Sequence, residues 1–171
     1  MNPTPKSAAR PTVLLALLYL GFFAYLALSA GQLPQRLATH FGGGGQADGW
    51  MTRTGYLEFM SLFGLAFPLG LVGIFALARF LPAAAWNLPN RDYWLAPERR
   101  AATCACLLRY ALWLACLILA LVIEMHYTTI AANREHPPHL PMRFFFMLLG
   151  CFLAGLAIWL ISFYRYFRRT D

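Results

Sequence analysis

Histidine and carboxylate side chains are the groups in this chain best suited to bind a metal ion or to move a proton. His40 and Asp48 flank a run of four glycines, and Glu124 and His126 lie near the end of an apolar segment. Imidazoles and carboxylates are common ligands of zinc and related ions. No two histidines are four residues apart, the spacing of a helical metal site. We therefore expect no bound metal ion and no other cofactor. If a metal ion does bind, His40 and Asp48 are the candidate ligands.

A structural role explains the same residues more simply. We expect His40 to hydrogen-bond within its own loop, and Glu124 and His126 to be solvated residues at a helix boundary. No serine or threonine forms a recognisable nucleophile motif with a histidine and an acid. We therefore expect no catalysis, and a metal-dependent membrane enzyme remains an alternative.

The glycine run at residues 42–45 is more typical of a turn than of a phosphate loop. A phosphate loop needs a helix start after its glycines, usually with a lysine, but Gln46, Ala47 and Asp48 follow here. The Asp48 carboxylate would repel phosphate. Glycine tolerates positive φ, and Asp48-Gly49 is a strong turn dipeptide, so this stretch predicts a sharp turn in a loop.

The composition indicates a membrane protein. Of the 171 residues, 60% are hydrophobic and 12% are charged, and the mean hydropathy is +0.54. Four apolar runs are long enough to cross a hydrocarbon core as helices of about 20 residues. They cover residues 13–30, 56–78, 104–123 and 144–163. We predict an all-α fold, a four-helix transmembrane bundle. Alternatively, the first run is a signal peptide cleaved after the small residues around Ser29.

Basic residues predict the orientation of the bundle, because cytosolic loops carry an excess of lysine and arginine. With the N-terminus inside, nine basic residues face the cytosol and four face the outer side. The cytosolic set is Lys6, Arg10, Arg79, Arg91, Arg99, Arg100, Arg165, Arg168 and Arg169, and the outer set is Arg36, Arg53, Arg134 and Arg143. We therefore expect an inner-membrane protein with both termini in the cytosol. We therefore expect the net charge of +7 to attract anionic lipid head groups rather than nucleic acid.

This topology divides the chain into four parts. Residues 1–12 form a cytosolic tail, and residues 13–80 form two spans joined by a structured extracytoplasmic loop at 31–55. Residues 81–102 form a cytosolic loop, and residues 103–171 hold the last two spans, a short outer loop and a basic tail. The candidate binding residues of the first outer loop are His40, Phe41, Asp48, Trp50 and Arg53.

Ionisable residues inside or at the ends of the spans are functional candidates by default. We expect Glu58 to reach water or to pair with Arg53. We expect Arg109 to reach the cytosolic interface, because its side chain points toward the N-terminus of its helix. In a small transporter or channel subunit, Glu58, Arg109, Glu124 and His126 would have to line one wet path.

Aromatic and basic residues alternate in the cytosolic loop. Such residues suit a chain that lies along the head-group region and fixes the second and third spans. A docking surface for a cytosolic protein or a lipid head group is the alternative, since tryptophan and arginine are enriched at binding hot spots. The candidate docking residues are Asn90, Arg91, Tyr93, Trp94, Arg99 and Arg100.

The first outer loop also carries an ordered motif. Leu33-Pro34 is followed by His40-Phe41, the glycine turn, Ala47-Asp48-Gly49-Trp50 and Arg53. This order resembles the motif of the DUF1648 family, the N-terminal domain of SdpI-like bacterial membrane proteins. The best-understood members of this family give immunity to a secreted toxic peptide and sequester a transcriptional repressor. The resemblance implies such roles for this chain. Those proteins have a larger C-terminal half than this chain.

These features favour a binding or accessory protein of the cell envelope, with an immunity-like role. Its expected partners are the anionic bilayer surface and a peptide or membrane protein that meets the outer loop.

Overall fold

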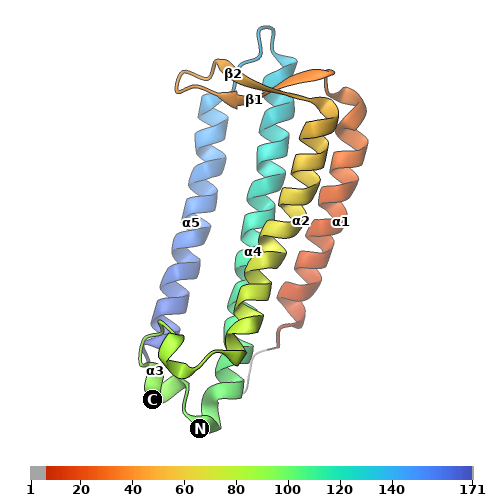
Figure 1. The fold of residues 1–171 in the computed structure, drawn as a ribbon. Helices are drawn as coiled ribbons and strands as arrows, with labels where there is room; N and C mark the ends of the chain where they lie inside the picture. The colour runs from red at the N-terminus through yellow and green to blue at the C-terminus, as the bar shows by residue number, and fades with distance from the viewer. Residues whose placement is uncertain (1–6, 171) are drawn as a thin grey trace.

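Four long helices, capped at one end by a β-hairpin, make up the computed structural model, which describes residues 7–170 (Figure 1). Each is long and apolar enough to cross a membrane, which confirms the predicted four-helix bundle. They are α1 (Ala9–Ser29), α2 (Arg53–Leu77), α4 (Pro97–Arg134) and α5 (Met142–Phe167). The start of α1 and the end of α5 lie at the end opposite the hairpin. We call these two ends the terminal end and the hairpin end. Lys6 lies outside the described residues.

Helix α4 is the centre of the bundle, since α1, α2 and α5 all pack against it. It has 38 residues, so it is about 57 Å long. The predicted span at 104–123 lies within this helix, which extends beyond it at both ends. Pro97 in the first turn and Glu98 beside it favour a helix start, and the helix continues past the apolar run to Arg134. Hydropathy detects only the part of a helix that lipid surrounds.

The loop between the first two spans is a two-stranded antiparallel hairpin, which was not predicted from the sequence. Strand β1 (Arg36–Phe41) pairs with β2 (Ala47–Thr52). Its turn is closed by Gly42 N–H donating to the carbonyl of Gln46 at 2.9 Å, and Gly45 has a φ of 86°. A glycine-containing connection of three to five residues between short strands is a known hairpin signal, so the glycine run did carry this information.

The connections at the terminal end are short and partly helical. They comprise η2 (Ala78–Phe80), η3 (Ala83–Ala85) and α3 (Arg91–Trp94), while η1 (Ala30–Gln32) extends α1 at the hairpin end. Asn90 precedes α3 in the left-handed conformation, with a φ of 50°, which asparagine tolerates better than most residues.

The core of the bundle depends on a close approach between α1 and α2. The fully buried ring of Phe22 on α1 lies against Gly64 on α2. A Cβ atom at Gly64 would lie 2.5 Å from that ring, so any larger residue would force the helices apart. The opposite, terminal end has a separate aromatic cluster that includes Trp94, Tyr110 and Phe167.

Candidate functional site

The hairpin presents a histidine–carboxylate pair to solvent. His40 Nδ1 contacts Asp48 Oδ1, and the two side chains are 77% and 53% exposed. The strand register shifts on both sides of His40. His40 pairs with Gly49 and Phe41 pairs with Ala47, so Asp48 has no partner in this register. Such irregularities re-aim side chains. Here the shift brings together two residues that are eight apart in the chain.

The other candidate residues of the hairpin surround this pair at different depths. Trp50 is 43% exposed, and the Arg36 guanidinium lies 5.7 Å from its ring centroid. Phe41 is half-buried at the end of β1. Arg53 is half-buried at the start of α2, and its Nε has no hydrogen-bond partner among the described residues. Arg53 and the exposed Glu58 form no ion pair in the described part of the chain.

The hairpin is fixed to the end of α4 by one asparagine. The side chain of Asn133 accepts from Ala38 N–H and donates to Ala38 C=O, both at 2.8 Å. Ala38 is fully buried, so these bonds satisfy two backbone groups that water cannot reach. The amide of Asn133 therefore acts as a strand neighbour on the free edge of β1. Asn133 was not among the predicted site residues, because its only signal in the sequence is a polar side chain near a helix end.

The loop between α4 and α5 fixes the turn of the hairpin. His139 Nε2 lies 3.1 Å from the carbonyl oxygen of Gly44, and Leu140 N–H donates to Gly45 C=O at 2.9 Å. A Cβ atom at Gly45 would lie 2.7 Å from the His139 ring. The turn is thus held against the bundle although its residues are glycines.

A buried polar cluster lies inside the bundle at the hairpin end. Ser29 Oγ is 2.8 Å from His126 Nε2, and Tyr56 Oη is 2.9 Å from His126 Nδ1. The ring of Tyr25 meets the imidazole edge-on, with ring centroids 4.8 Å apart. The imidazole thus joins side chains from α1, α2 and α4.

The expectation that His126 is a solvated boundary residue was wrong, because it is 0% exposed. Helix α4 continues for two further turns beyond it, which keeps it inside the bundle. A serine on a histidine also suggests nucleophilic chemistry. However, Ser29 is buried and donates to Tyr25 C=O at 2.6 Å, and a tyrosine takes the place of the orienting acid. The geometry fits a structural link between helices.

Glu124 lies on a different face of α4 from His126. It follows Leu117 by seven residues, and Leu117 packs against Gly155 of α5, so Glu124 lies on the face toward α5. The residue is half-buried, and its Oε2 has no hydrogen-bond partner among the residues that the structure describes.

The four ionisable residues that a transport path would need do not lie close together. Arg109 lies fifteen residues before Glu124, or about 22 Å along α4. Its Nη2 is 3.8 Å from the Cys106 thiol. Glu58 is exposed on α2, whereas His126 is enclosed. Among residues 7–170, no three histidine, cysteine, aspartate or glutamate side chains are grouped to hold a metal ion.

Residues predicted for docking at the terminal end make contacts within the fold. Asn90 Nδ2 donates to Arg168 C=O at 2.8 Å, and Trp94 Nε1 donates to Phe167 C=O at 2.8 Å. Both therefore cap the C-terminal carbonyls of α5. Arg100 Nη2 donates to Leu81 C=O at 2.6 Å and so holds the chain that leaves α2.

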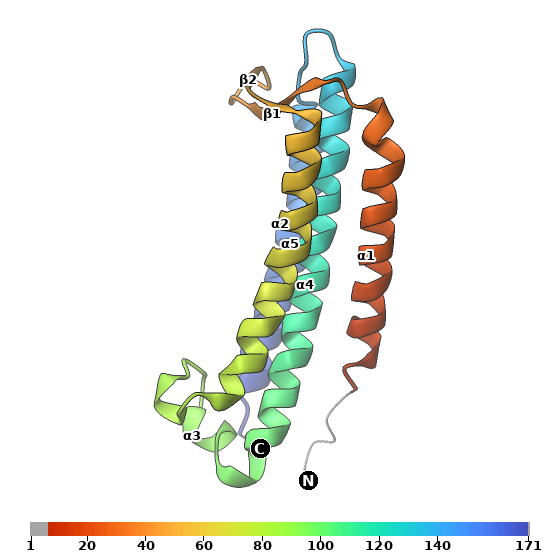
Figure 2. The same cartoon turned by 45° about the vertical axis from the view of Figure 1, so that its right-hand side comes forward.

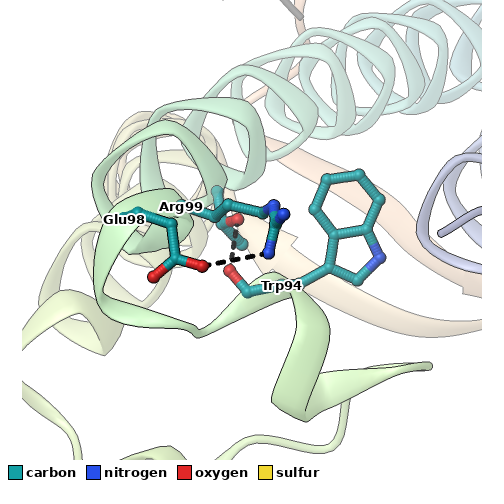
Figure 3. A network of polar contacts seen from close by, with 4 residues as sticks. Trp94, Glu98 and Arg99 are labelled. Carbon is teal, nitrogen blue, oxygen red and sulfur yellow. Dashed lines mark hydrogen bonds and ion pairs between the residues drawn. The ribbon is translucent and has the colours of Figure 1, made fainter. Parts of the chain in front are cut away.

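The remaining basic residues of this loop lie beside acids. Arg99 Nη1 donates to Glu98 Oε1 at 3.2 Å (Figure 3). The Arg99 guanidinium also lies 4.2 Å from the ring centroid of Tyr93, and Arg91 pairs with Asp92.

One comparison with known proteins gives a match. Residues 14–65 match a domain of unknown function, DUF1648, which confirms the resemblance inferred from the outer-loop motif. The matched segment holds most of α1, the whole hairpin and the first half of α2. No curated protein and no solved structure matches the chain. The chain is therefore a membrane protein in which residues 14–65 are similar to the DUF1648 domain.

Proposed function

We propose that this protein is a binding component of the cell envelope, and that its hairpin recognises a peptide or another membrane protein outside the inner membrane. One observation carries the proposal: Asn133 and His139 bond the hairpin to the rest of the fold, yet His40, Asp48 and Trp50 remain exposed. A pre-organised surface loses little conformational freedom on binding.

The free edge of β2 supports an extended peptide as the ligand. The other edge of β1 is occupied by Asn133, whereas β2 pairs with β1 alone within the described sheet, and the loop at His139 bridges only to Gln46, just before β2. An exposed strand edge offers unpaired N–H and C=O groups to a further strand. Side chains of β2 alternate in exposure, with Asp48, Trp50 and Thr52 exposed, so specificity for such a peptide comes from an acid, an aromatic ring and a hydroxyl.

The orientation belongs to the same proposal. With both termini in the cytosol, nine basic residues lie on the cytosolic side and four on the outer side. The hairpin then faces outward, where a secreted peptide arrives. An immunity-like role follows if the bound peptide would otherwise damage the membrane.

Photo-crosslinking in whole cells tests this proposal. A photoreactive phenylalanine analogue replaces Trp50, and the same analogue at Phe80, on the terminal end, is the control. We expect a cross-linked product from position 50 that position 80 does not give, and that Asp48→Asn weakens. Equal labelling at both positions, or no product at position 50, would refute the proposal.

A second readout examines the immunity-like role. Cells that lack this protein are complemented with the wild type, Trp50→Ala or the distant variant Arg168→Gln, and then exposed to membrane-active peptides. We expect Arg168→Gln to restore growth and Trp50→Ala to fail. If both variants restore growth equally, the hairpin does not act in protection.

A further inference from the structure

An apolar groove lies between α1 and α5, over α4, on the terminal half of the bundle. Its volume is about 510 Å³, and it is lined by Leu14 and Leu18 of α1, Trp113 and Ala120 of α4, and Ile158 and Trp159 of α5. Both views place α4 between α1 and α5 (Figures 1 and 2). The three helices span the membrane, so this groove opens toward lipid.

The polar atoms along the groove already have partners within the protein. Tyr110 Oη donates to Ser162 C=O at 3.2 Å, and Trp159 Nε1 donates to Tyr110 C=O at 2.9 Å. The Cys116 thiol lies 3.5 Å from the carbonyl oxygen of Pro11. The groove therefore offers hydrocarbon surface, which suits an acyl chain rather than a polar ligand.

Each wall of the groove leads to an arginine at the terminal end. Arg10 lies four residues before a groove-lining leucine of α1, Arg109 lies four before Trp113, and Arg165 lies seven after Ile158. Helical residues at these spacings share one face. We call Arg10, Arg109 and Arg165 the mouth arginines.

The mouth arginines keep their positive charge unneutralised. The described acids of the terminal end are committed elsewhere, because Asp92 lies 3.3 Å from Arg91 and Glu98 lies 3.2 Å from Arg99 (Figure 3). No mouth arginine forms an ion pair within residues 7–170. The guanidinium of Arg109 instead contacts a thiol and an aromatic ring.

We infer that this groove binds one anionic phospholipid from the leaflet at the terminal end. Its acyl chain lies along the groove, and its phosphate lies among the mouth arginines. Basic pockets between transmembrane helices attract anionic head groups, and the guanidinium fork matches phosphate oxygens. A zwitterionic lipid supplies the same chain without the net negative charge. The site is distant from the hairpin and does not depend on the proposed function.

Native mass spectrometry of the delipidated full chain tests the head-group preference. The protein is titrated with phosphatidylglycerol and, separately, with phosphatidylethanolamine of the same acyl chains. We expect one phosphatidylglycerol to bind in preference, and each of Arg10→Gln and Arg109→Gln to weaken it about fivefold. Arg168→Gln removes the same charge from the same end outside the groove and should leave binding unchanged. Equal binding of both lipids, or equal effects of all three variants, would overturn the inference.

A filled groove provides the second test. Ala120 lines the groove, whereas Ala157 is exposed on another face of α5, so Ala120→Phe and Ala157→Phe are matched variants. We expect the bound lipid to be lost only with Ala120→Phe, and size-exclusion chromatography to show that both variants stay folded. If Ala120→Phe instead dissociates a dimer of the wild-type chain, a second copy occupies the groove and the lipid site is refuted. Added inorganic phosphate should not displace the lipid, and displacement would mean that the arginines bind free phosphate.

Discussion

Side-chain hydrogen bonds hold both ends of the bundle, but the terminal end also has a continuous aromatic cluster. At the hairpin end, a few polar side chains bond to specific atoms, as Asn133 bonds both backbone groups of Ala38. At the terminal end, aromatic rings pack in a continuous cluster, in which Phe163 lies 4.8 Å from Phe167 and 5.3 Å from Tyr110 between ring centroids. Directional bonds define one geometry, whereas packed rings share the stabilisation among many neighbours. The hairpin end thus depends mainly on directional bonds, whereas the terminal end adds aromatic packing to the bonds of Asn90, Trp94 and Arg100.

The largest loss of stability is expected from Phe167→Ala at the terminal end. Phe167 is fully buried and contacts the rings of Trp94, Tyr110 and Phe163, so its removal leaves a cavity. We expect the free energy of unfolding to fall by about 3 kcal/mol, measured by denaturant titration in detergent micelles. Tyr164→Ala, at an exposed position of the same helix, is the control. A loss as small as that of the control would show that the cluster does not hold this end.

A smaller loss is expected from His126→Ala, which removes two interhelical hydrogen bonds and the ring itself. Hydrogen bonds between transmembrane helices average about 0.6 kcal/mol, and with the cavity we expect about 2 kcal/mol in the same titration. Tyr56→Phe removes one of these bonds and should cost less than half as much. If the two variants cost the same, the imidazole does not link three helices.

Asn133→Ala should affect the hairpin more than the helices. It leaves the N–H and C=O groups of Ala38 without partners, and we expect a cost of about 1.5 kcal/mol. Hydrogen exchange should quicken at the Ala38 amide while α5 is unchanged. Asn133→Asp keeps the acceptor for the Ala38 N–H and should exchange more slowly than Asn133→Ala. Uniform acceleration along the chain would contradict a local role.

The smallest effect is expected from His40→Ala and Asp48→Asn. Both side chains are more than half exposed, and exposed ion pairs contribute little to stability. We expect the free energy of unfolding to stay within about 0.5 kcal/mol of the wild type, measured as for Phe167→Ala. A loss above about 1 kcal/mol would mean that the pair holds the hairpin instead of facing a ligand.

The sequence predicted the spans well because lipid imposes a strong and simple rule. An apolar run of about 20 residues is long enough to cross the hydrocarbon core, and the four runs found in this way correspond to α1, α2, α4 and α5. The DUF1648 motif was also recognisable from its ordered residues. Proline and glutamate at 97–98 indicated the start of α4, but its end at Arg134 was not predicted, since the helix continues past the apolar run.

The internal contacts of polar residues could not be predicted in the same way. Ser29, Tyr56 and His126 are far apart in the chain, and their meeting depends on how three helices rotate about their axes. Hydropathy carries no information about that rotation. The contact between His40 and Asp48 depends on the register of β1 and β2, and the glycine turn alone does not determine that register.

The central position of α4 has a consequence for how the protein is made. The segment that matches DUF1648 ends at residue 65, yet its buried groups are completed by residues that are translated later. Ser29 and Tyr56 have their hydrogen-bond partner in His126, and Ala38 has its partner in Asn133, both on α4. A chain that stops before α4 would therefore lack the partners of Ser29, Tyr56 and Ala38, and its first two spans would remain an unfinished pair.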